Sequence, residues 1–169
     1  YFPEPDLVPI KIAAEAIEEI RRSIPELPDA KRERFAKDYG LPEYDADMLT
    51  QSRAMANYFE EATRLSNQPK TVSNWMMGEL MRLINADGKE IDDSPIKPDR
   101  LAGLIKMIDN GVISTKIAKT VFEEMYKNGK DAETVVQEQG LVQVSDTGAI
   151  ETIIDDVIKA NPGQAADYK

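Results

Sequence analysis

The sequence contains neither histidine nor cysteine among its 169 residues. Without histidine, the chain lacks the commonest general base and the commonest metal ligand, and without cysteine it lacks a thiol nucleophile and any disulfide. The phosphate-binding patterns GxxxxGK[ST] and GxGxxG are also missing. We therefore assign no catalytic residue, no metal ligand and no cofactor to this stretch, and a free-standing enzyme is disfavoured.

Long hydrophobic runs are missing too, so the sequence predicts no transmembrane helix, and no signal-peptide pattern opens it. The lack of cysteine fits a reducing compartment. We expect a cytoplasmic protein without a membrane partner. Because the chain begins at Tyr1 inside a motif and ends at Lys169 without an obvious stop, we also expect it to be a fragment of a longer protein.

Positive charge is scarce as well. The net charge is −10 with a pI of about 4.6, and residues 1–100 and 101–169 carry balances of −6 and −4. Nucleic-acid-binding proteins usually show a basic surface. DNA is therefore not expected as a partner, and any contact with RNA must be local.

What the sequence does contain is helical periodicity. Between residues 110 and 140, Gly111, Gly129 and Gly140 are suited to end helices, while Ser114 and Asp131 are suited to cap the helices that follow. The middle helix has an apolar face at 3/4 spacing, formed by Ile117, Ala118, Val121, Phe122 and Met125. This stretch predicts three short helices joined by tight turns.

The first part of the chain has the same character. Three prolines predict an extended segment over 1–10. A helix with an isoleucine-rich face is expected from Ile12 to the prolines at 25 and 28, and a charged helix over 29–39. The basic residues of that second helix form either a basic patch or a solvated face mixed with acids, and we favour the solvated face; they are Lys31, Arg32, Arg34 and Lys37.

A helix or a broken helix pair is predicted over 45–65, followed by a helix from Pro69 to Ile84 that is apolar on almost all sides. Trp75 lies in that second helix, so we assign it to the core. The aromatic residues Tyr58 and Phe59 lie on an apolar stripe, which indicates packing and not stacking on unpaired bases.

Periodicity fails between residues 85 and 98, where the composition is that of an exposed loop, and we place a domain boundary there. Its acidic residues do not follow the spacing of a calcium-binding loop. After Gly140, an extended piece over 141–145 and a last helix capped by Asp146 are expected. The apolar stripe of that helix is formed by Ile150, Ile153, Ile154, Val157 and Ile158.

Two separated motifs resemble a known family. The segment GVISTKIAKTVFEEM, residues 111–125, is similar to the tail shared by the B subunit of tRNA-dependent amidotransferases and the small YqeY-like proteins. The segment YFPEPDL, residues 1–7, resembles the stretch that leads out of the catalytic cradle of that protein, which favours the amidotransferase. The stretches ELPDAKRERFAKDYGLPEYDADMLT and MANYFEEA also resemble its helical region.

The resemblance implies an all-α architecture, a helical bundle followed by a smaller YqeY-like tail. Its expected divisions are an extended segment from the cradle over 1–10, a helical domain over 11–98 and a truncated tail domain over 99–169. The parent enzyme is an ATP-dependent, glutamine-hydrolysing ligase with A and C subunits, and ATP and Mg²⁺ belong to it and not to this fragment. It converts Glu-tRNA(Gln) or Asp-tRNA(Asn) to Gln-tRNA(Gln) or Asn-tRNA(Asn).

The resemblance thus implies a noncatalytic tRNA-recognition portion, and the alternative is a helical protein-docking module for subunit assembly without direct RNA contact. Candidate tRNA-binding residues are Lys116, Lys119, Lys127 and Lys130. A helix start near Lys116 and Lys119 offers exposed N–H groups to anions. The competing interpretation is that Lys119 and Lys127 pair with Glu123 at i,i+4 spacing and only solvate the helix.

Overall fold

The computed structural model describes residues 11–141 and 147–161, with the side chains of 147–153 left out. Every regular element within these ranges is a helix, which confirms the all-α class. None of these helices combines the length and the hydropathy needed to cross a bilayer. The predicted extended segment over 1–10, most of the piece over 141–145, the Asp146 cap and the side chains of Ile150 and Ile153 lie outside the described residues.

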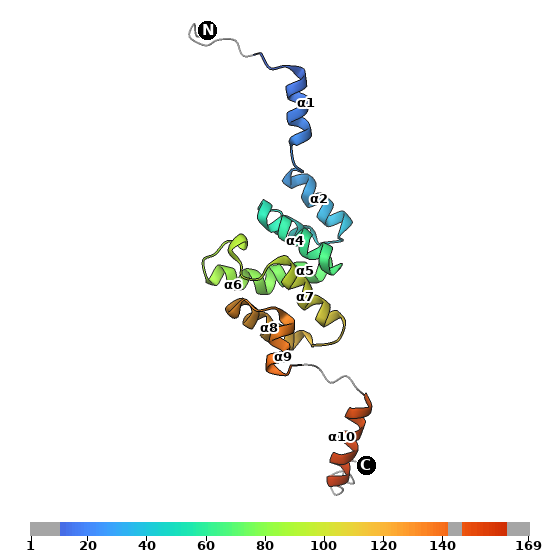
Figure 1. Cartoon of the computed structure of the whole chain (residues 1–169). Helices are drawn as coiled ribbons and strands as arrows, with labels where there is room; N and C mark the ends of the chain where they lie inside the picture. Colours follow the sequence, from blue (N-terminus) through green and yellow to red (C-terminus); the bar gives the residue numbers. More distant parts are fainter. Residues whose placement is uncertain (1–10, 142–146, 162–169) are drawn as a thin grey trace.

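The chain forms short helices in the order shown in Figure 1. Those before the loop are α1 (Ala14–Ser23), α2 (Pro28–Asp38), α3 (Glu43–Leu49), α4 (Arg53–Ser66), α5 (Pro69–Trp75), the π-helix η1 (Met76–Leu80) and α6 (Met81–Ala86). Those from the loop onward are the 3₁₀-helix η2 (Ile91–Asp93), α7 (Pro98–Asp109), α8 (Thr115–Asn128), α9 (Ala132–Gln139) and α10 (Thr147–Ala160). The packed part runs from α2 to α9, with α1 and α10 drawn at its opposite ends.

Helix α4 is the centre of this packing. Its predicted stripe of Met55, Tyr58, Phe59 and Ala62 is buried, and α7 packs along it. The Tyr58 hydroxyl donates to the carbonyl of Ile96 at 2.9 Å, so the polar end of a buried ring is satisfied. The predicted break before this helix is also observed, because Ser52 caps α4 by accepting from the Met55 N–H at 3.1 Å.

The predicted helix from Pro69 is continuous but contains a π-turn. α5, η1 and α6 follow one another without a gap, and Gly78 lies in the wider turn. Trp75 is buried and its ring lies 5.2 Å from that of Phe122 on α8, which confirms its assignment to the core. Three residues of the expected all-round apolar surface are only half-buried: Met77, Met81 and Leu83.

One hydrophobic core extends through the packed helices, from Phe35 on α2 to Val136 on α9. The loop between α6 and α7 takes part in it, because Ile91 and Ile96 are buried and the Ser94 hydroxyl is buried between them. Residues 85–90 of the loop are exposed, as its composition predicts, but Ile91, Ser94 and Ile96 anchor its second part to the core. The division of the chain into domains at this loop stays a prediction.

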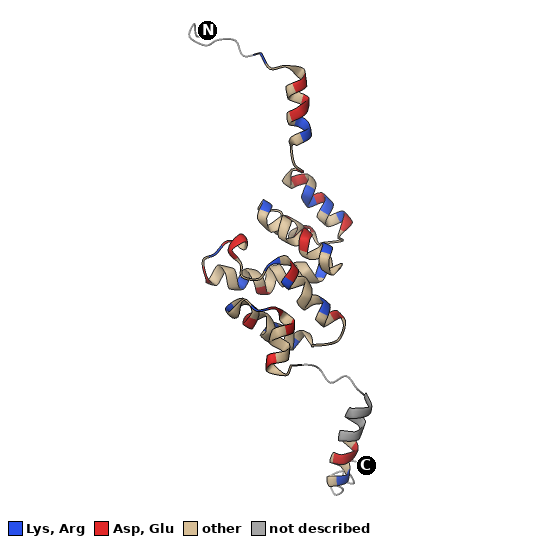
Figure 2. Cartoon of the chain, viewed as in Figure 1, with Lys and Arg blue, Asp and Glu red and all other residues tan. Residues whose placement is uncertain are grey.

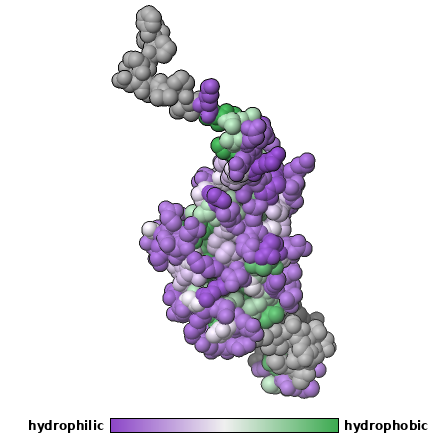
Figure 3. Space-filling model, turned by 45° about the horizontal axis from the view of Figure 1, so that its top comes forward, coloured by the Kyte–Doolittle hydropathy of each residue, from purple (hydrophilic) through white to green (hydrophobic). Residues whose placement is uncertain are grey.

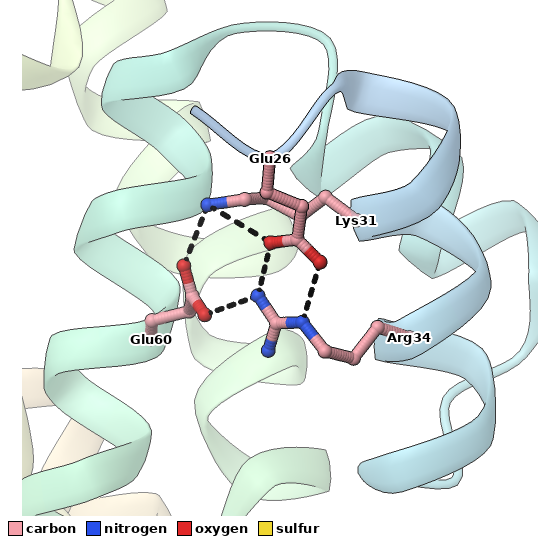
Figure 4. A network of polar contacts seen from close by, with 4 residues as sticks. All are labelled: Glu26, Lys31, Arg34 and Glu60. Carbon is pink, nitrogen blue, oxygen red and sulfur yellow. Dashed lines mark hydrogen bonds and ion pairs between the residues drawn. The ribbon is translucent and has the colours of Figure 1, made fainter. Parts of the chain in front are cut away.

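A compact group of ion pairs attaches α2 to α4 (Figure 4). Glu26, just before α2, accepts from both Arg34 Nε and Arg34 Nη2, at 2.7 and 2.6 Å. Glu60 on α4 accepts from the same Nη2 at 2.6 Å and from Lys31 Nζ at 2.8 Å. These side chains are 16–32% exposed, so the pairs are screened less than those of a fully solvated surface.

The pKa values of both carboxyls in this group lie below their usual 4.5. For Glu26 the main cause is the hydrogen bond from Arg34. For Glu60, desolvation by burial raises the pKa, but the hydrogen bonds from Lys31 and Arg34 together outweigh it. The folded state therefore binds fewer protons than the unfolded state as these groups titrate. Their contribution to the free energy of unfolding is fully present above pH 4.5 and is lost as the pH falls through their folded pKa values.

Glu60→Gln is expected to lower the free energy of unfolding by about 1–2 kcal/mol at pH 7, because a charge-assisted pair becomes a neutral one. The loss should shrink as the pH is lowered from 7 to 3 in a series of urea titrations. Glu33→Gln, an equal charge change at an exposed residue of α2, is the control and should change stability little at any pH. A penalty for Glu60→Gln that is the same at every pH would contradict the assignment.

Phe122→Ala should lower the free energy of unfolding by about 3–5 kcal/mol, because it leaves a cavity beside Trp75. Trp75 is the chain's single tryptophan, so its fluorescence reports on the centre of the fold during a urea titration. We expect this transition to coincide with that of far-UV circular dichroism and to shift with it in the variant. If the substitution did not change the urea midpoint of the Trp75 transition, the result would instead support separate domains. Phe122→Leu is the milder control.

Candidate nucleic-acid interface

The turn before α8 is built as the sequence predicts. Gly111 has a φ of 69°, a value that glycine adopts without strain, and the chain then enters α8. The Ser114 hydroxyl accepts from the Ile117 N–H at 3.3 Å, which satisfies one of the unpaired donors at the start of the helix. At the other end, Gly129 has a φ of 65° and its carbonyl accepts from the Arg100 guanidinium on α7. Helix α8 is thus fixed at both ends.

The inner face of α8 is buried against the core, with Ala118, Val121, Phe122 and Met125 enclosed and Ile117 half-buried. This leaves Lys116, Lys119 and Lys127 exposed on the outer side, and Lys130 exposed in the turn before α9. The helix therefore presents its lysines to solvent, as the candidate interface requires.

Three of the four candidate lysines have acidic partners within the protein. Lys119 Nζ lies 2.9 Å from Glu79 Oε1, Lys127 Nζ lies 3.2 Å from Glu124 Oε1, and Lys130 Nζ lies 2.7 Å from Glu138 Oε2. Lys116 has no ion pair with any residue in the described part of the chain. Of the four, Lys116 is the one whose charge these pairs leave uncompensated.

Neither Lys119 nor Lys127 pairs with Glu123, so the partner named in the competing interpretation is wrong. Glu123 instead accepts from Arg82 Nη2 at 2.7 Å, and the same nitrogen lies 3.0 Å from Glu79 Oε2. For Lys119 the reason is tertiary, because packing of Phe122 on Trp75 brings α8 alongside η1 and α6, where Glu79 and Arg82 are located, whereas Lys127 pairs within α8, with Glu124 three residues before it. Side chains from another helix then compete with the partners one turn away.

Glu79 is the shared acid of this group. Its pKa is lowered, first by the hydrogen bond from Lys119 and then by the one from Arg82, so it stays ionised at neutral pH. Ion pairs at the protein surface contribute about 0–1 kcal/mol, and these pairs each join a half-buried Glu79 to an exposed cation. The phosphates of a partner can therefore replace the carboxylates as partners of the lysines at little cost in free energy. The acidic residues nevertheless reduce the positive electrostatic potential that such a partner meets.

The other candidate features are accounted for within the protein. Lys31 and Arg34 belong to the half-buried group that joins α2 to α4, and Arg32 lies 3.5 Å from Asp47, so these cations are paired with acids of other segments and form neither a free basic patch nor a simple solvated face. In Figure 2, basic and acidic residues are interspersed over the packed helices. Tyr58 and Phe59 are buried, so they are not a stacking surface.

A groove of about 480 Å³ beside α3 and α6 is lined by four methionines, Met48, Met55, Met77 and Met81, together with polar and charged residues that include Gln51, Lys89 and Glu90. No group of three acidic side chains among the residues that the structure describes could hold a metal ion. Sequence patterns miss this groove, since its walls come from separate helices and meet only in the folded chain.

Comparison with known proteins decides the family. A family profile described as "GatB domain" matches residues 57–169, well over half of the chain. The chain belongs to the GatB domain family. The match begins within α4 and includes α8 with all four candidate lysines.

Relatives of this GatB-domain chain are named as the B subunit of aspartyl/glutamyl-tRNA(Asn/Gln) amidotransferase. The protein of Carboxydothermus hydrogenoformans is 54% identical over 169 residues, and those of Trichlorobacter lovleyi and Caldanaerobacter subterraneus are 54% and 55% identical. Each alignment covers the whole chain but only 35–36% of the relative. The chain thus spans about a third of their length and corresponds to their C-terminal part.

Ser114→Ala is expected to lower the free energy of unfolding by about 1 kcal/mol, because the cap that starts α8 is lost. A urea titration followed by Trp75 fluorescence measures it. Ser114→Asp keeps an acceptor at the same position and is the matched control, with stability close to that of the parent. Equal losses in both variants would show that the serine acts through something other than the cap.

Proposed function

We propose that this chain is a noncatalytic tRNA-recognition portion of an amidotransferase B subunit. In this proposal it helps an enzyme with A and C subunits to convert Glu-tRNA(Gln) or Asp-tRNA(Asn) to Gln-tRNA(Gln) or Asn-tRNA(Asn). ATP and Mg²⁺ are used elsewhere in the enzyme, and the chain itself supplies no catalytic group. The observation that carries the proposal is the similarity, along the whole chain, to proteins whose name includes tRNA(Asn/Gln).

The outer side of α8 supports the RNA contact. It combines the exposed Lys116 with Lys119 and Lys127, whose carboxylate partners are half-buried and contribute weak surface ion pairs. Folded RNA is recognised largely by shape and by contacts to its phosphates and 2′-hydroxyls. A rigid helix with a few cations suits that mode even on an acidic protein.

A second candidate function is docking to other subunits without RNA contact. The net charge of −10 and the acidic partners of Lys119, Lys127 and Lys130 favour it. The two functions differ in their response to salt. Phosphate contacts lose affinity steeply as salt rises because counterions are released, whereas an apolar protein contact does not.

Lys116→Glu/Lys119→Glu tests the proposal with a labelled tRNA(Asn) or tRNA(Gln) transcript in a fluorescence anisotropy titration. The affinity should fall, and the slope of log affinity against log salt should decrease by about 1.4–1.8 if each lysine neutralises one phosphate. Thermal melting of the variant checks that the fold is kept.

Lys37→Glu/Lys70→Glu makes the same change in net charge at exposed lysines on α2 and α5 and is the control. Equal losses of tRNA affinity in both double variants would mean that only the net charge of the protein matters. Binding by the Lys116/Lys119 variant that matches the parent across the salt series would exclude this side of α8 and favour the docking function.

A further inference from the structure

Helix α1 has an apolar face that nothing in the described structure covers. Ile17, Ile20 and Ile24 lie on one side of it and are 45%, 59% and 53% exposed. The opposite side carries Glu15, Glu18 and Arg22, so the helix is amphipathic. In Figure 3, hydrophobic residues gather on α1, next to the grey N-terminal segment.

Helix α1 has no buried residue and is only ten residues long. Isolated helices shorter than about 12–15 residues are marginal in water, because few hydrogen bonds offset the cost of nucleation. The apolar face therefore needs a surface to pack on if the helix is to persist. Such a face is a typical anchor for an amphipathic helix that lies in a hydrophobic groove.

The connection to α2 holds α1 away from the core. Ile24 and Leu27 have extended backbones, and each precedes a proline, which restricts the chain to such conformations. Leu27 is also 61% exposed and extends the apolar side beyond the helix. This geometry projects α1 outward, where it can contact a part of the polypeptide other than α2–α9.

A second copy of the chain is a poor occupant. A ten-residue helix is about 15 Å long and about 10 Å wide, whereas stable interfaces bury about 800 Å² on each partner. A pair of α1 helices offers only a few hundred Å² per copy. The occupant must supply a larger apolar surface or be tethered close to the helix.

The relatives contain a further part of the same polypeptide that is tethered to this helix. The chain covers 35–36% of their length, and the rest of their polypeptide precedes the stretch that matches it. In them, the stretch that matches α1 belongs to the same polypeptide as that larger part, so the two meet within one chain at a raised effective concentration. We propose that the isoleucine face of α1 docks onto an apolar surface of this preceding part of the B subunit, and so fixes the packed helices to it.

Hydrogen exchange at the α1 amides tests the docking. This chain is compared alone and as a replacement for the matching stretch in the full-length Carboxydothermus hydrogenoformans protein. We expect the α1 amides to exchange freely in the chain alone and to be slowed by at least about 100-fold in the full-length protein. Slow exchange of the α4 and α7 amides in both proteins shows that the core is folded.

Ile17→Glu/Ile20→Glu should restore fast exchange of α1 in the full-length protein and leave the melting of the chain alone unchanged, since neither residue belongs to the core. Glu15→Gln/Glu18→Gln, on the opposite side, is the matched control and should keep the protection. Unprotected α1 amides in a full-length protein with a folded core would overturn the proposal. Protection in the chain alone that rises with protein concentration would also overturn it, because a second copy would then be the occupant.

Discussion

The contact between Trp75 and Phe122 determines where the candidate interface lies. Both rings are buried, with their centroids 5.2 Å apart. Their contact joins the continuous helix of α5, η1 and α6 to α8. Aromatic pairs of this kind remove large apolar areas from water and tolerate few relative orientations. With its inner face fixed in this way, α8 can present only its outer side, with Lys116, Lys119 and Lys127, to a partner.

The same contact limits the charge of that side. Once α8 lies beside η1 and α6, Glu79 pairs with Lys119, and Arg82 connects Glu79 to Glu123. Packing and electrostatics are therefore coupled. The packing that turns the lysines of α8 outward also brings Glu79 beside them, and this carboxylate neutralises part of their charge. An interface of this type suits a partner held by several weak contacts at once, and it does not suit one that needs a strong basic patch.

The N-terminal half depends on a different kind of contact. Glu26, Lys31, Arg34 and Glu60 join α2 to α4 through ion pairs, while Phe35 and Phe59 pack beneath them with ring centroids 4.8 Å apart. Helix α1 lies beyond this point and contributes no buried residue. The described chain thus has a packed centre and, at its N-terminal side, an amphipathic helix whose apolar face is left for another surface.

The sequence by itself determined most of the helices, the Ser114 cap of α8 and the buried faces of α4 and α8, because these follow from local rules. Asp131 lies at the N-cap of α9 as predicted, but its side chain makes no cap hydrogen bond and accepts from the Thr134 hydroxyl at 3.0 Å instead. Apolar residues at 3/4 spacing gave the buried stripes of α4 and α8, and the hydroxyl of Ser114 and the positive φ of Gly129 appear where the pattern predicted them. The family resemblance was also readable from the sequence, and it rested on residues 111–125, inside the matched region, and on residues 1–7, before it. Tertiary structure decided the rest. Three features join residues from separate elements. They are the ion pair of Lys119 with Glu79, the burial of Ile91 and Ile96 from a loop of polar composition, and the groove lined by four methionines. Spacing along the chain carries no information about which helices meet, so these contacts become visible only after the core has packed.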